Sequence, residues 1–156
     1  MKMKAMKETP PIETLIPHRQ RMRLIDTIVS VDQDHAVTRA TVSPDWPLMT
    51  ADGANPIVLI ELAAQTAGVC LGWSETAKPE EQRGQSGGWL VGIKRAHFSI
   101  DRLPGGTCIT IRSDTTMAVD QYKEITAAAD VDGNPVGEVQ LQVLQAGKTA
   151  FSSLSG

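Results

Sequence analysis

The sequence predicts an α+β fold in which an antiparallel sheet wraps around one long helix at about residues 55–73. This segment, NPIVLIELAAQTAGVCLGW, carries apolar residues around nearly the whole helical circumference, so the helix must be buried. A hairpin pattern precedes it, and four strand-like segments follow it. A single sheet of this size leaves one face of the helix uncovered. We therefore expect dimerisation, with edge strands pairing into a continuous sheet.

Length and composition indicate one globular domain. The 156 residues are 41% hydrophobic, which is enough apolar material for a real core. We expect a flexible N-terminal tail at 1–10, a single domain at 11–147 and a C-terminal tail at 148–156.

Charge and cysteine content exclude several classes of function. A net charge of -3 argues against a nucleic-acid binder. Cys70 and Cys108 are too few for a disulfide framework or a metal knuckle, so we expect reduced thiols, a cytoplasmic location, and neither metal nor cofactor. The N-terminus lacks the apolar segment of a signal peptide. The longest uncharged run, 62–74, is shorter than the roughly 18 residues of a membrane span.

The chain before the long helix is predicted to form a short helix and a hairpin. Residues 12–16 follow two prolines and end at Pro17, which disfavours helix in the residue before it. A strand pattern starts at Met22, the turn 32–34 follows, and a second strand covers 35–42.

The long helix has a clear start and a row of small residues. Loop 43–55 leads to Asn55, a plausible N-cap, and to Pro56, which fits the first helical position. Ala64, Gly68 and Gly72 form a ridge at intervals of four, and we expect a sheet backbone to approach it closely.

The C-terminal half is predicted to contain four successive strands. A polar, glycine-rich loop at 78–88 separates them from the helix. The turn sequences LPGG, DQ and DGNP divide the strands from one another. The strands are placed at about 89–100, 107–119, 122–131 and 136–146.

Two polar residues in the apolar helix, Glu61 and Gln65, are the first candidates for a site. Their spacing of four places them side by side on one helical face. A carboxylate in so apolar a helix indicates a functional role. The alternative is a buried acid held by Gln65 or by a backbone N–H across a dimer.

Three segments resemble a known family. They are PHRQRMRLID (17–26), PIVLIELAAQTAG (56–68) and GWLVGIKRAHFSIDRLPGG (88–106), and together they resemble the hot-dog-fold β-hydroxyacyl-acyl carrier protein dehydratases of bacterial fatty-acid synthesis. The resemblance implies a hot-dog fold. The family's E-x-x-A-Q motif places the acid at Glu61 and its neighbouring amide at Gln65.

The loop before the helix departs from that family. Where the fatty-acid enzymes carry their catalytic histidine in a glycine-histidine-phenylalanine-proline-glycine signature, this loop reads WPLMTADGANP, and Pro47 falls about at the histidine position. The loop instead resembles the divergent dehydratase branch associated with aryl-polyene biosynthesis, which has a proline-histidine motif near its N-terminus. The residues that carry this second resemblance are Pro47, Leu48, Asp52, Gly53, Pro56 and Glu61.

Dehydration of a 3-hydroxyacyl thioester needs a base, an acid and a group that polarises the thioester carbonyl. Histidine suits the base, because its ordinary pKa is near 6.5. A carboxylic acid kept protonated by an apolar site suits the acid, here Glu61. Backbone N–H groups at the helix start, at Ile57 and Val58, suit the third role. Asp52 is a candidate for placing water or substrate, although an aspartate before a glycine is usually a turn former.

Three histidines compete for the role of base. His35 stands beside an acidic turn and is interpreted as a solvated residue, and His97 is expected to point outward from its strand. His18, at the proline break, is the candidate that the resemblance favours. The alternative for His18 is an imidazole bonded to a backbone carbonyl that fixes the turn.

Three functions remain open from the sequence. The leading hypothesis is a dehydratase that converts 3-hydroxyacyl thioesters of acyl carrier protein or CoA into trans-2-enoyl thioesters. The second is a hot-dog thioesterase in which Glu61 activates water. The third is a catalytically degenerate subunit, in a heteromer with an active dehydratase. Homodimer and heteromer both stay open.

Overall fold

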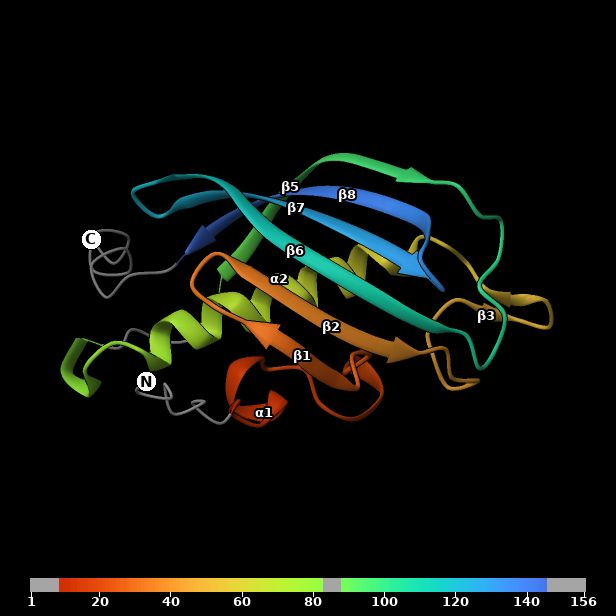
Figure 1. Ribbon diagram of the computed structural model, residues 1–156, viewed down its shortest axis with the longest axis horizontal. Helices are drawn as coiled ribbons and strands as arrows, with labels where there is room; N and C mark the ends of the chain where they lie inside the picture. The colour runs from red at the N-terminus through yellow and green to blue at the C-terminus, as the bar shows by residue number, and fades with distance from the viewer. Residues whose placement is uncertain (1–8, 83–87, 146–156) are drawn as a thin grey trace, which may run out of the picture.

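The computed structural model describes residues 9–82 and 88–145. A six-stranded antiparallel sheet, in the order β1-β2-β6-β7-β8-β5, curves around the long helix α2 (Val58–Thr76), as Figure 1 shows. The predicted architecture is therefore confirmed. The predicted C-terminal tail and all but residues 9 and 10 of the N-terminal tail lie outside the described residues. Residues 83–87 of the predicted loop at 78–88 also lie outside them, and Glu80–Gln82 of that loop form a 3₁₀ turn, η2.

The strands agree closely with the predicted segments in the second half of the chain. Antiparallel ladders join β2 to β6, β6 to β7 and β7 to β8, and β5 pairs with β8 at one edge of the sheet. The strand bounds are β1 Thr27–Val31, β2 His35–Thr41, β5 Gly88–Phe98, β6 Cys108–Val119, β7 Tyr122–Val131 and β8 Asn134–Gln145.

The strand predicted to start at Met22 is wrong in its first part. Residues Gln20–Met22 form a 3₁₀ turn, η1, and β1 begins only at Thr27. The N–H groups of Leu24 and Ile25 donate to Gln65 Oε1, at 2.9 and 3.4 Å, instead of pairing with a strand. The Gln65 side chain on α2 thus satisfies backbone N–H groups in a segment whose sequence alternates like that of a strand.

The start of α2 also differs from the prediction. The loop before it contains a small hairpin of β3 (Met49–Thr50) and β4 (Gly53–Ala54). Asn55 Oδ1 accepts a hydrogen bond from the N–H of Ile57 at 3.0 Å, so Asn55 supports the turn that leads into the helix. Regular helix begins at Val58, two residues after the expected first helical position Pro56, and continues to Thr76.

The core lies between α2 and the concave face of the sheet. Leu59, Leu62 and Val69 of the helix are almost fully buried, as are Ile111 on β6 and Leu141 on β8. A side chain at Gly137 of β8 would place its Cβ 2.7 Å from Leu59 Cδ1. The close contact between helix and sheet therefore depends on a glycine in the sheet. No helix in the described ranges is long and apolar enough to cross a membrane.

The glycine ridge of α2 does not face the sheet, so this prediction is wrong. A Cβ at Gly72 would lie 2.2 Å from the carbonyl oxygen of Leu15, and one at Gly68 would lie 3.1 Å from Ile16 Cγ2. The ridge receives the N-terminal segment that contains α1 (Ile12–Leu15). The spacing of the small residues identified a helical face that another element approaches closely, but it did not identify that element.

We predict that Gly72→Ala destabilises the protein by about 1–3 kcal/mol, because the new methyl group overlaps the Leu15 backbone, which must shift. Urea denaturation measures the change. Gly105→Ala is the matched control, since its Cβ would find its nearest atom, Met49 Cε, at 4.0 Å. Equal stability of the two variants would contradict the packing of α1 on α2.

Candidate active site

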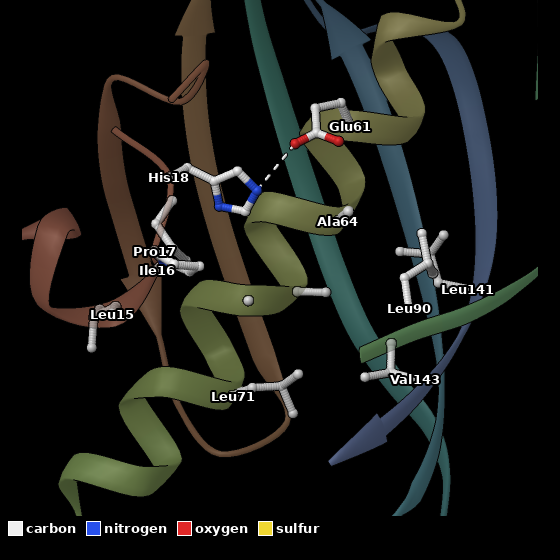
Figure 2. A pocket seen from close by; sticks show the side chains of 12 residues that line it. Leu15, Ile16, Pro17, His18, Glu61, Ala64, Leu71, Leu90, Leu141 and Val143 are labelled. Carbon is white, nitrogen blue, oxygen red and sulfur yellow. Dashed lines mark ion pairs between the residues drawn. The ribbon is translucent and has the colours of Figure 1, made fainter. Parts of the chain in front are cut away.

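His18 and Glu61 meet although they are far apart in sequence. His18 lies between α1 and η1, Glu61 lies in the first turn of α2, and His18 Nε2 is 3.2 Å from Glu61 Oε1 (Figure 2). Both residues belong to the same chain. The Glu61 side chain is 41% exposed in this single chain, so it is less buried than its apolar sequence context predicted.

An elongated apolar pocket of about 240 Å³ begins at this pair. It follows one face of α2 from Glu61 past Ala64 and Gly68 to Leu71, a span of roughly 15 Å at the helical rise per residue. Figure 2 shows the remaining walls, which come from the N-terminal segment and from strands β5 and β8. These wall residues are Leu15, Ile16, Pro17, Leu90, Leu141 and Val143. A pocket with its polar groups at one end suits a slender apolar ligand with a polar head.

Gln65 supports the acid, as its spacing from Glu61 predicted. Its side chain is fully buried, and its Nε2 donates to Glu61 Oε1 at 2.9 Å and to the carbonyl oxygen of Met22 at 2.6 Å. With Oε1 accepting from the N–H of Leu24, both ends of the amide are engaged. The orientation of Glu61 is therefore coupled to the segment that follows His18.

His18 does not fix its turn through a backbone carbonyl. Its Nδ1 is buried and has no hydrogen-bond partner among the described residues. The alternative that the sequence left open for His18 is therefore not supported, because the ring makes its polar contact at Nε2, with Glu61.

The other predicted site residues do not lie beside the His18–Glu61 pair. The N–H groups of Ile57 and Val58 donate to Asn55, at 3.0 Å to Oδ1 and 3.1 Å to the carbonyl oxygen. Asp52 lies in the exposed turn between β3 and β4. None of these three lines the pocket, and their contact with substrate stays a prediction.

The two remaining histidines lie away from the pocket. His35 Nδ1 is 2.6 Å from Asp114 Oδ1 on the neighbouring strand β6. His97 is exposed on β5, opposite Glu138. Within the described ranges, no group of three or more histidine, cysteine or acidic side chains is placed to hold a metal.

The groups with shifted pKa values lie outside the pocket. A hydrogen bond from Tyr122, followed by one from Lys94, lowers the pKa of Glu124, and burial raises the pKa of Tyr122. Cys70 is buried in the core, and this burial raises the pKa of its thiol to about 11, which disfavours the thiolate that a nucleophile needs. Sequence reasoning did not single out the Glu124 network or the pocket wall at Leu15 and Leu90, because single polar and apolar residues there carry no motif.

Comparison with known proteins identifies the family. A family model described as ApeP-like, ApeP dehydratase, matches residues 10–153. The 3-hydroxyacyl-[acyl-carrier-protein] dehydratase FabZ of Streptococcus uberis is 30% identical over 136 residues, which cover 78% of this chain and 86% of that protein. FabZ of Streptococcus pyogenes serotype M1 matches with the same identity and coverage.

Solved structures agree on the fold. The dehydratase heterocomplex ApeI:P from Xenorhabdus doucetiae superposes with a TM-score of 0.78 at 22% identity, over 93% of this chain and 97% of that one. A hypothetical thioesterase with coenzyme A from Streptococcus pneumoniae TIGR4 gives a TM-score of 0.61 at 14% identity, over 78% and 85%. At these identities the structures support the hot-dog fold alone. The match of the family model to residues 10–153, together with the FabZ relatives, shows that this chain belongs to the ApeP-like dehydratase family.

Proposed function

We propose that this protein dehydrates 3-hydroxyacyl thioesters to trans-2-enoyl thioesters, with His18 and Glu61 as the catalytic pair. The observation that supports this most directly is the 3.2 Å approach of His18 Nε2 to Glu61 Oε1 at one end of an apolar pocket. The loop histidine of the fatty-acid enzymes is replaced by Pro47, and His18 supplies an imidazole at the acid from another part of the chain.

The shape of the pocket suits a substrate of this reaction. Elimination of water removes a proton from C2 and delivers one to the hydroxyl group on C3, so both transfers occur within two carbon atoms of the thioester. The acyl chain would lie along α2 toward Leu71, with C2 and C3 beside Glu61. The FabZ relatives are named for acyl carrier protein substrates, and we propose the same kind of carrier here, with CoA as the alternative.

We also propose that the chain works as a dimer or heteromer. Strand β5 pairs only with β8 in the described chain, and Trp89, Leu90, Val91 and Ile93 on it are exposed. An open edge that carries such side chains favours pairing with another strand. The ApeI:P structure is a heterocomplex, so the proposed partner is a second copy of this chain or a related dehydratase subunit.

A second candidate function is thioester hydrolysis. Glu61 Oε2 makes no hydrogen bond to the described residues, and the side chain is 41% exposed. A carboxylate oxygen open to solvent is suited to activating water, and this would need no histidine.

We predict that Glu61→Gln lowers the rate of interconversion of 3-hydroxyacyl and 2-enoyl pantetheine thioesters by about 10²–10⁴-fold. The amide keeps an acceptor for Gln65 but cannot exchange a proton, so the melting temperature should change little. Glu138→Gln, at an exposed position of β8, is the control. Full activity of Glu61→Gln in a folded protein would refute the assignment.

The same assay separates the candidate functions. Interconversion without release of free thiol is the result expected of a dehydratase, and thiol release would indicate the thioesterase. Inactivity in both, recovered when a partner dehydratase is added, would indicate a degenerate subunit.

We predict that Val91→Lys converts the assembly to monomer, because a charge on β5 opposes strand pairing. Size-exclusion chromatography with light scattering measures the mass. Val29→Lys is the matched control, since Val29 is also exposed but lies on β1 at the opposite edge. A monomeric wild type, or dissociation by the β1 variant alone, would contradict the proposed interface.

A further inference from the structure

The partners of Gln65 determine which atom of its side chain faces Glu61. The N–H groups of Leu24 and Ile25 point at Oε1, and the carbonyl oxygen of Met22 accepts from Nε2. Backbone donors and acceptors cannot exchange roles, so the amide has one orientation. Its Nε2 therefore donates to Glu61 Oε1 whatever the protonation state of the acid.

Glu61 Oε1 therefore accepts a hydrogen bond from Gln65, and because a carboxylic O–H is a poorer acceptor than a carbonyl or carboxylate oxygen, a proton on this carboxyl group is favoured on Oε2. His18 Nε2 lies 3.2 Å from the same Oε1. Two bare lone pairs at this distance repel each other, whereas an N–H directed at a carboxylate oxygen is attracted to it. The contact therefore favours a hydrogen on Nε2 of His18.

The second ring nitrogen indicates that the imidazole is neutral. His18 Nδ1 is buried without a partner among the described residues. A protonated ring would bury a second, charged N–H with no acceptor, which is more costly than burying a bare nitrogen. The favoured form is the neutral tautomer with hydrogen on Nε2.

We infer that Glu61 acts as the base of the proposed reaction and that His18 is a positioning residue, which holds the carboxylate through its Nε2–H. The inference rests on the proposed function and reverses the roles expected from the sequence. In this tautomer the nitrogen that faces Glu61 has no free lone pair, and the nitrogen that has one is buried.

The elimination then needs one carboxyl group. Glu61 Oε2, which Figure 2 shows turned away from His18, takes the proton from C2. The C2–C3 double bond forms as the C3–O bond breaks, and Oε2 returns the same proton to the departing hydroxyl group, which leaves as water. Glu61 ends as the carboxylate with which it began, and His18 neither gains nor loses a proton.

The tautomer can be measured without any assay of activity. In ¹⁵N-histidine-labelled protein, long-range ¹H–¹⁵N spectra distinguish a ring nitrogen that carries hydrogen from a bare one. The signals of His18 are identified by their loss in His18→Gln. We expect hydrogen on Nε2 and a bare Nδ1, and the opposite tautomer would overturn the inference.

Kinetics provides a second test. A glutamine at position 18 offers an N–H donor near the place of Nε2 but cannot act as a base. We expect His18→Gln to keep kcat/KM within about tenfold of wild type, and His18→Phe, which has no donor, to fall further. His97→Gln is the control on exposed β5.

A loss in folded His18→Gln as large as the roughly 10²–10⁴-fold expected for a missing base would overturn the inference. If the wild type has no dehydratase activity, the proposed function fails, whereas the labelled spectra still decide the tautomer.

Discussion

The buried side chain of Gln65 is the contact on which the site depends. It joins Glu61 on α2 to the carbonyl of Met22 and to the N–H groups of Leu24 and Ile25. Each buried backbone group left without a partner would cost about 1–3 kcal/mol, so the amide holds this segment to the helix although no strand pairs with it. His18 precedes the segment by only four residues, and its position follows from the same contacts.

Packing holds the other side of the His18 segment. Gly68 and Gly72 let Ile16 and Leu15 lie directly against α2, so His18 is fixed between a close packing contact and a hydrogen-bonded one. Because the chain is held on both sides of His18, its imidazole has little freedom and lies beside Glu61. The loop around Pro47, which bears the catalytic histidine in the fatty-acid enzymes, leads here into the β3–β4 hairpin. An imidazole thus reaches the acid without that loop.

The sequence was sufficient for elements whose partners are regular. Alternation and turn chemistry located β2, β6, β7 and β8, and all-round apolarity located α2. The same rules failed at Met22, because the partner of that backbone is a side chain 43 residues away. They also failed at the glycine ridge, because small residues allow a close contact but do not indicate which element makes it. Family resemblance named His18 and Glu61 as candidates, but their approach to one another is known only from the structure. The inferred hydrogen on Nε2 likewise rests on distances and burial.

Because Glu61 is partly exposed in the single chain, a second chain that covered it would change which reaction its carboxylate can carry out. A carboxylate with an open Oε2 can remove a proton from a substrate or from water, and what decides between them is access of solvent. If a second chain covers the open side of the helix start, water is excluded, and the proton taken from C2 is retained for the departing hydroxyl group. If that side stays open, the same oxygen is free to activate water against the thioester.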